Sequence, residues 1–335
     1  MIKKIVYITT IILLNFTSIY SQKGGETLFS ALQITHSARL TALGGNQTAL
    51  KATDLSMLQH NPATLDSSLL KNITVGFVPY LAGINYGYAG YAFNTPGNGQ
   101  FAIGLYHLNY GNFDGRDQFG TETGTFSAGE TILQLTYSMQ LHERVKAGIS
   151  FKPLYSKIER YNSWGLAADL GVIYNSENSL TSYGIALRNF GYQITAYDES
   201  HEGAIKPDLQ IGVTHKPRHA PFRLSLTAQN LIHGSLNYSL NQSQNNDDSN
   251  SFAQNILRHT TIGVEFLPSE NFYIAAGVNP KRRQELKIES KTSTVGFSWG
   301  LGFKVDKFNF SYGSSHYHLG GSSNHFTVTT RLADW

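Results

Sequence analysis

The chain has 335 residues, of which only 15% are charged, and its formal net charge at pH 7 is +3. So small a charge argues against a nucleic-acid-binding protein, and the complete lack of cysteine excludes disulfides, thiol chemistry and lipid attachment through cysteine. Glycine (32), tyrosine (19) and phenylalanine (19) are abundant at a mean hydropathy of -0.23. This combination is typical of a membrane barrel. Apolar lipid-facing residues alternate with polar lumen-facing residues, so their hydropathies cancel when averaged along the chain.

Residues 1–21 have the pattern of a secretory signal peptide. Lys3 and Lys4 form the basic start, an apolar core follows over residues 5–16, and the small residue Ser21 precedes the predicted cleavage before Gln22. The apolar run is too short for a helical membrane anchor, which needs about 20 residues. We therefore expect an exported protein.

Residues 22–71 do not alternate and are predicted to form a plug or hatch. A turn at Leu43-Gly44-Gly45 precedes an apolar pattern that predicts a short helix over residues 49–58. The helix should stop at Asn61-Pro62, before Ala63, because proline disfavours helix for the residue before it. The segment either folds into a lumen or hangs free as a periplasmic tail. Its apolar residues need cover, which favours the lumen.

Residues 72–335 are predicted to form a barrel. The alternation is clearest near the end, where one parity carries Val295, Phe297, Trp299, Leu301, Phe303 and Val305 and the other carries Gly296, Ser298, Gly300, Gly302 and Lys304. Alternate residues of a strand lie on opposite faces, so the large residues should face lipid and the small ones the lumen.

Fourteen strands can be marked. They start near Asn72, Asn85, Gln100, Glu130, Val145, Ser163, Thr181, Pro207, Phe222, Arg258, Phe272, Thr294, Phe308 and Asn324. Connections after even strands are short, and most after odd strands are long and polar, at residues 111–129, 196–206, 232–257 and 281–293. We therefore predict an all-β, membrane-spanning antiparallel barrel of about 14 strands in an outer membrane, with periplasmic termini and extracellular long loops. The last strand ends in an aromatic residue, Trp335, which resembles an insertion signal.

Two groups of charged residues are candidate binding features. Asp169, Arg188, Glu265 and Lys304 have the inward parity, and because ions at membrane depth are costly unless paired or wet, a lumen ion network is expected. Lys281, Arg282 and Arg283, with Lys287 and Lys291, form a basic loop. This loop either contacts lipopolysaccharide phosphates or is merely solvated, and the sequence leaves both open.

No catalytic, cofactor or metal site is predicted. Residues 296–300 match the G-x-S-x-G motif of serine hydrolases, but that motif needs a strand-to-helix elbow, whereas Ser298 lies within an alternating strand. His316 and His318 could share a metal on one strand face, yet no third ligand is spaced to complete it. Asp114 and Asp117 lack the regular ligand run of a calcium loop.

The Leu43-Gly44-Gly45 turn, the Asn61-Pro62-Ala63 motif and the fourteen strands together resemble the FadL-like outer-membrane barrels, in which the Asn-Pro-Ala region belongs to a hatch inside the barrel. Residues 28–45, 54–65 and 108–115 are more specifically similar to the PorQ family of the type IX secretion system of Bacteroidetes. That resemblance implies a non-enzymatic barrel holding the surface attachment complex of PorZ, PorU and PorV. The alternative is a FadL-like transporter of hydrophobic small molecules, against which the largely small or polar inward residues argue.

Overall fold

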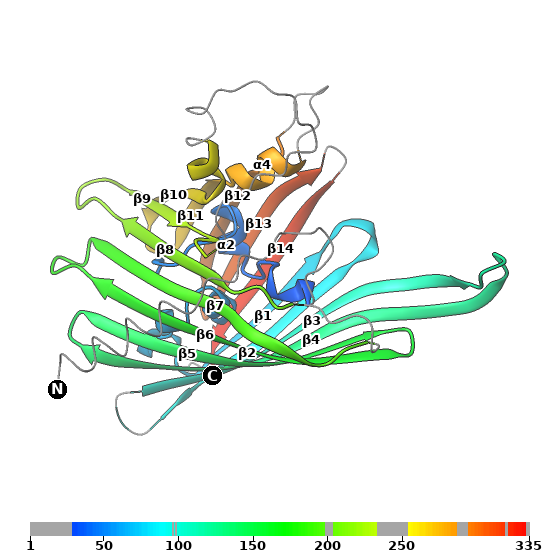
Figure 1. Ribbon diagram of the computed structural model, residues 1–335. Helices are drawn as coiled ribbons and strands as arrows, with labels where there is room; N and C mark the ends of the chain where they lie inside the picture. The colour runs from blue at the N-terminus through cyan, green and yellow to red at the C-terminus, as the bar shows by residue number, and fades with distance from the viewer. Residues whose placement is uncertain are drawn as a thin grey trace.

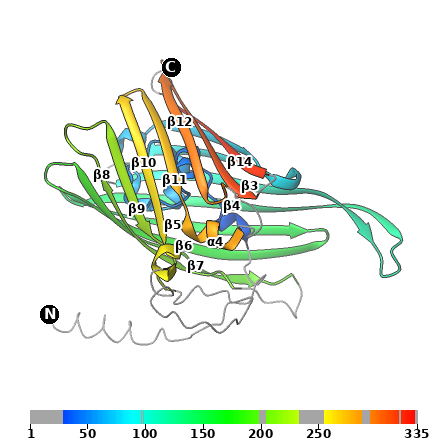
Figure 2. The same ribbon diagram turned by 90° about the horizontal axis from the view of Figure 1, so that it is seen from above.

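The structure is a computed structural model that describes residues 29–95, 97, 99–197, 204–232, 254–286, 294–318 and 321–332. It is a closed barrel of fourteen antiparallel strands, in which each strand pairs with its neighbours along the chain and β1 closes the barrel against β14 (Figures 1 and 2). The predicted fold class and strand count are confirmed. The predicted signal peptide, Lys287, Lys291 and Trp335 lie outside the described residues.

The strands span β1 Asn72–Pro79, β2 Asn85–Asn94, β3 Gly99–Arg116, β4 Glu122–His142, β5 Val145–Ile158, β6 Tyr161–Asn175, β7 Thr181–Thr195, β8 Asp208–His215, β9 Phe222–Ala228, β10 Thr260–Ser269, β11 Phe272–Val278, β12 Phe297–Val305, β13 Phe308–His318 and β14 Gly321–Arg331. We call the end where β1 begins and β14 ends the terminal end. The opposite end, where helix α4 (Pro280–Leu286) follows β11, is the loop end.

The wall is uneven in height. Strands β3 to β7 have 14 to 21 residues, whereas β8 to β12 have 7 to 10. The loop expected over residues 111–129 is wrong: β3 and β4 continue as a paired hairpin through Phe113 and Phe126, which projects beyond the wall (Figures 1 and 2). Only residues 159–160 separate β5 from β6, so long connections after odd strands are fewer than expected.

The outward face of the wall is apolar, as the alternation predicts. Trp299 is 48% exposed while its neighbour Ser298 is 5% exposed. Val295, expected on the outward face, is instead buried, because β12 begins only at Phe297 after Gly296 takes a positive φ of 85°. Among the described residues, no helix is long and apolar enough to cross a membrane.

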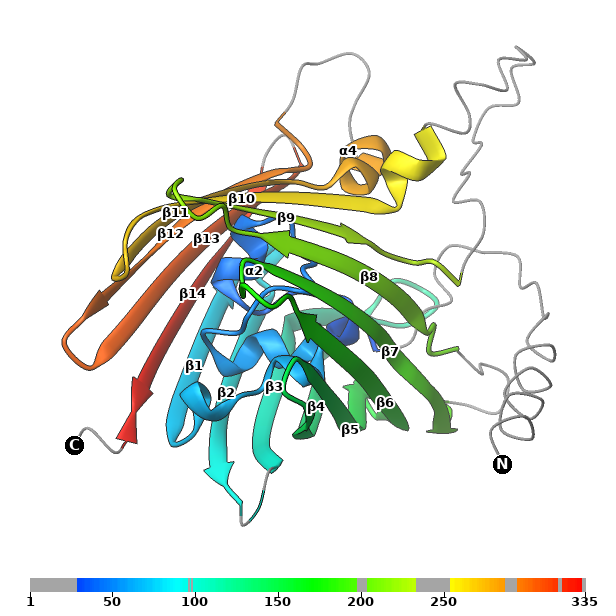
Figure 3. The ribbon, with the colours of Figure 1, turned by 90° about the vertical axis from the view of Figure 1, so that its left-hand side faces the viewer.

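Residues 29–71 form the plug, which lies inside the barrel (Figure 3). It contains η1 Ser30–Leu32, α2 Ala38–Ala42, η2 Leu55–Gln59, η3 Pro62–Thr64 and η4 Ser67–Leu69. The Ser37 hydroxyl caps α2 by accepting from the Leu40 N–H, which explains why so short a helix forms here. The helix predicted over residues 49–58 is reduced to one 3₁₀ segment, η2. Asn61-Pro62 ends η2 as expected but also starts η3, since proline fits the first helical position.

Candidate functional site

The plug is seated on glycines of the barrel wall. The inward glycines in contact with it are Gly148, Gly165, Gly171, Gly184, Gly212, Gly263, Gly277, Gly300 and Gly313, from eight strands, two of them on β6. A Cβ added at Gly148 would lie 2.5 Å from the backbone N of Ala63, and one added at Gly300 would lie 2.6 Å from the Ala42 Cβ. Because real Cβ atoms do not approach so closely, only glycine lets the plug backbone lie directly against the wall.

The Leu43-Gly44-Gly45 turn ends α2 and holds the plug near the loop end. Gly44 and Gly45 have φ values of 95° and 108°, a conformation that L side chains rarely adopt. Asn279, which follows β11, donates a hydrogen bond of 3.1 Å from its Nδ2 to the Gly44 carbonyl. A Cβ at Gly44 would also lie 2.6 Å from Thr261 Cγ2, so the close approach and the positive φ both require glycine.

Asn61-Pro62-Ala63 holds the plug against β5 and β6. The Asn61 Oδ1 accepts from the Ala63 N–H at 3.0 Å, and its Nδ2 donates to the Thr48 carbonyl at 2.8 Å. The same Nδ2 reaches the Val172 carbonyl of β6 at 3.4 Å. One buried amide thus caps η3, bridges two parts of the plug and contacts the wall.

Charged residues from plug and wall form one side of the lumen, which we call the polar sector. Arg39 of α2 forms a two-pronged ion pair with Glu265 of β10, at 2.7 Å from Nε and 3.0 Å from Nη2. Arg223 of β9 donates to the same carboxylate at 3.0 Å. The side chains of Arg39 and Glu265 are 3% and 0% exposed, so a fully desolvated pair joins plug to wall.

Asp169 and Arg188 also lie in the polar sector, but not as a pair. Asp169 pairs with Lys152 of β5 and accepts from the Asn189 N–H at 2.7 Å. Arg188 donates to the Gln59 carbonyl of the plug at 3.0 Å. Lys304 does not join them. Its side chain is exposed beside the turn between β12 and β13, because the end of β12 extends beyond the lumen.

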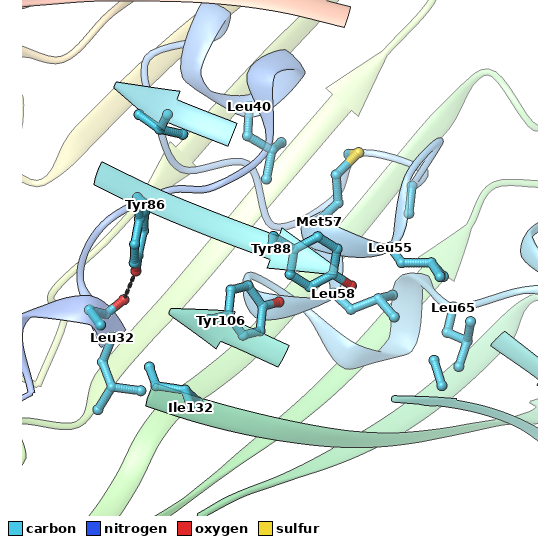
Figure 4. Close-up of a cluster of buried hydrophobic side chains, with 14 of the residues drawn as sticks. Leu32, Leu40, Leu55, Met57, Leu58, Leu65, Tyr86, Tyr88, Tyr106 and Ile132 are labelled. Carbon is cyan, nitrogen blue, oxygen red and sulfur yellow. Dashed lines mark hydrogen bonds between the residues drawn. The ribbon is translucent and has the colours of Figure 1, made fainter. Parts of the chain in front are cut away.

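The apolar sector adjoins the polar sector at β5 and comprises inward side chains of β2 to β5, at Tyr86, Tyr88, Tyr106, Leu108, Ile132 and Leu154. Figure 4 shows the plug residues Leu32, Leu55, Met57, Leu58 and Leu65 packed against it. The Tyr86 hydroxyl donates to the Ala31 carbonyl at 2.6 Å, and the rings of Tyr88 and Tyr106 lie 4.6 Å apart. The sequence interpretation of a mostly polar lumen therefore missed this side, although Tyr86 and Tyr88 already share the inward parity.

The predicted basic loop is in part a lid over the barrel. Within α4, Arg282 stacks on the Tyr317 ring at 4.1 Å and donates to the Ser315 hydroxyl, and Arg283 stacks on Phe297 at 5.2 Å. Lys281 lies 4.0 Å from Glu285 within the helix. These contacts fix two of the three predicted lipopolysaccharide-contacting cations against the barrel.

Ser298 has a structural role. Its hydroxyl donates to the carbonyls of Ala42 at 3.2 Å and Gly277 at 3.3 Å, joining plug and wall. Among the described residues, no group of three or more histidine or acidic side chains could hold a metal ion.

A cavity of about 610 Å³ lies at the terminal end, between the plug and the turns that follow β4, β6 and β8. Asp66 of the plug stands between Lys51 at 3.3 Å and Lys146 of β5 at 3.6 Å. Burial raises the pKa of Asp66, but hydrogen bonds from Ser68 and the charges of Lys146 and Lys51 outweigh burial and hold this pKa below its usual value. The carboxylate therefore stays ionised at neutral pH.

Comparison with known proteins identifies the fold. No family model matches the sequence, and no curated protein matches it. Among solved structures, the chain is similar to the toluene transporter TbuX of Ralstonia pickettii, with 12% identity, a TM-score of 0.52, and coverage of 92% of this chain and 99% of that one. The toluene transporter TodX of Pseudomonas putida matches at 11% identity and TM-score 0.51, covering 88% and 96%. The monoaromatic hydrocarbon channel CymD matches at 13% identity and TM-score 0.50, covering 88% and 96%.

This chain has the fold of those channels. At such low identity the likeness establishes the fold, and it agrees with the FadL-like barrel that the sequence motifs predict. The fold is that of an outer-membrane barrel, which supports the predicted location.

Proposed function

We propose that this protein is a non-enzymatic outer-membrane channel for hydrophobic small molecules, closed by its plug in the present conformation. The observation that carries the proposal is the apolar sector, where Tyr88, Tyr106 and Ile132 face apolar plug residues inside the lumen. A purely structural plug could be held by the polar sector and the glycines alone. An apolar interface between a plug and a wall favours apolar permeants, because a shift of the plug opens a path lined by apolar surface.

The similarity to toluene transporters and a monoaromatic hydrocarbon channel supports the same permeant class. A molecule of that class would travel between the plug and β2 to β4, along the apolar sector.

The test is hydrocarbon uptake with the plug fixed in place. The chain has no cysteine, so Leu43→Cys with Gly263→Cys introduces one defined pair. A Cβ at Gly263 would lie 3.0 Å from the Leu43 Cβ, within a few tenths of an ångström of the roughly 3.5–4.5 Å that a disulfide needs.

Proteoliposomes with the wild-type barrel, prepared with lipopolysaccharide to slow direct entry of toluene through the lipid, should take up radiolabelled toluene faster than empty liposomes of the same lipids, and should not admit a sugar of similar size. The double cysteine variant should lose toluene uptake when oxidised and regain it on reduction, while each single variant should behave alike in both states. Equal toluene uptake by empty and protein-containing liposomes would refute the channel.

A second function, a docking scaffold for surface proteins, is favoured by the β3–β4 hairpin. The pairing of β3 with β2 ends at Asn109, and the pairing of β4 with β5 begins at Ala128. The hairpin therefore continues as a two-stranded arm with stacked Phe113 and Phe126 rings, 5.4 Å apart, and with Phe119 83% exposed at its tip. Exposed aromatic side chains on a projecting arm suit a protein partner.

Under this second proposal the partners are those implied by the PorQ resemblance, the attachment-complex proteins PorZ, PorU and PorV, with lipopolysaccharide at Lys281, Arg282 and Arg283. Replacing residues 112–126 by a tight turn should leave a folded barrel but abolish co-purification of these proteins from gently solubilised membranes. The single substitution Phe119→Ala should weaken this co-purification. Unchanged co-purification, or none with the wild type, would remove the scaffold function.

A further inference from the structure

The cavity at the terminal end has the composition of an anion-binding site. Its lining includes five cationic side chains, which are Lys51, Arg144, Lys146, Lys216 and Arg223. Its acidic lining residues are Asp66, Glu143 and Glu177. Glu143 is exposed and the Glu177 side chain is 83% exposed, so these two lie at the mouth. Asp66 is 12% exposed and is the acid that faces Lys51 and Lys146.

The deeper cations are also the residues that attach the plug to the wall. Lys146 of β5, 22% exposed, pairs with Asp66 of the plug, while Arg223 of β9, 23% exposed, pairs with the carboxylate that holds Arg39. Each cation therefore has one side toward an ion pair and another toward the cavity. Arg144 is paired with Glu177 at 2.7 Å, and one carboxylate, Asp66, is shared by two lysines, so five cations and three acids leave a net positive charge around a space of about 610 Å³. That volume is within the usual range of small-ligand pockets.

We propose that this cavity binds a small polyanion with two or more carboxylate or phosphate groups, which competes with Asp66 for Lys51 and Lys146. This inference goes beyond the channel function, because the cavity is on the polar side of the plug and away from the apolar sector. A ligand that replaces Asp66 as the partner of Lys146 removes one plug-to-wall contact. Anion binding at the terminal end should therefore weaken the attachment of the plug to the wall, and release of the plug should in turn strengthen anion binding.

The test uses purified full-length barrel in an uncharged detergent at low ionic strength, because charge interactions at a partly open site are screened by salt. Titration calorimetry with inorganic pyrophosphate and, separately, with citrate should show saturable binding. Lys51→Gln with Lys146→Gln should weaken it by at least about tenfold, the size of a typical lost charge-assisted contact. The matched control is Lys304→Gln, an exposed lysine at the same end and outside the cavity lining, which should bind as the wild type does.

Asp66→Asn provides the decisive variant. Asparagine can still accept the hydrogen bond from the Ser68 N–H, so the fold of η4 is kept while the competing charge is removed. Anion affinity should rise by about fivefold or more, the lower end of typical coupling between sites. Unchanged affinity in this variant would overturn the competition, and equal weakening by Lys304→Gln would show a diffuse surface effect and overturn the site. Preference for pyrophosphate over citrate would assign the ligand to the phosphate class, and the reverse preference to the carboxylate class. Neither outcome depends on hydrocarbon transport.

Discussion

Removing the Glu265 carboxylate should release the plug. Glu265→Met leaves Arg39, whose side chain is 3% exposed, without its anionic partner at 2.7 Å, and leaves Arg223 facing it. Breaking a buried ion pair from one side typically costs about 3–5 kcal/mol, because a desolvated charge stays uncompensated. Release of the plug into water relieves that cost. The equilibrium between seated and released plug should therefore shift by about 10²–10⁴-fold.

The control is the double variant Glu265→Met with Arg39→Met, which removes both charges. It still loses the Arg39 hydrogen bonds to the Lys51 carbonyl at 3.2 Å and the Thr53 hydroxyl at 3.1 Å, each a net contribution of about 1 kcal/mol. It should nevertheless seat the plug much better than the single variant does.

Hydrogen exchange read by mass spectrometry on peptides covering α2 and η2 measures this directly. Those amides should exchange about 10²–10⁴-fold faster in Glu265→Met, and far less so in the double variant, while wall strands such as β4 stay protected. If the two variants exchange alike, the Arg39–Glu265 pair does not hold the plug and the reasoning is wrong.

Three further outcomes are expected. Trp299→Arg places a charge on the lipid face and should destabilise the barrel in bilayers by about 2–4 kcal/mol in urea titration, and wild-type stability would disprove the strand parity. Gly277→Val would overlap the Gly44 backbone, so native limited proteolysis should cut the plug at Leu43 to Leu65 in this variant and spare it in the wild type. Because the pKa of Asp66 is held below the ordinary value of 3.8, the contribution of this carboxylate to plug stability is present above that pH and lost as pH falls through the lower folded value. The protection of plug amides, measured relative to the intrinsic exchange rate at each pH, should therefore fall below about pH 4 in the wild type and change less with pH in Asp66→Asn, and identical profiles would exclude this carboxylate.

The positions that needed glycine were only partly readable from the sequence. Gly44 and Gly45 could be recognised as a turn because a Gly-Gly pair after an apolar residue is a local signal. Gly148 and Gly171 looked like any small inward residue. Their role depends on contact with the plug at Ala63 and Asn61, about 80 to 110 residues away along the chain. A local sequence pattern cannot predict such a distant contact.

The charged residues show the same limit. The inward parity of Asp169, Arg188 and Glu265 followed from counting along each strand. Their partners did not, since Lys152, Arg39 and the Gln59 carbonyl are brought to them by strand register and by the path of the plug. Lys304 has the right parity but lies at the end of its strand, beyond the lumen, and parity alone carries no information on depth.

The sequence by itself determined the barrel, because an alternation of period two is a local property of a strand whose two faces meet lipid and lumen. It also determined the number of strands and the presence of a separate segment before them. The tertiary structure alone decided how that segment fills the lumen, which strands are tall, and that residues 111–129 extend β3 and β4 as a paired arm beyond the wall. It also divided the interior into an apolar and a polar sector. Those features arise from contacts between distant parts of the chain, where packing and charge pairing act without leaving a regular pattern in either partner.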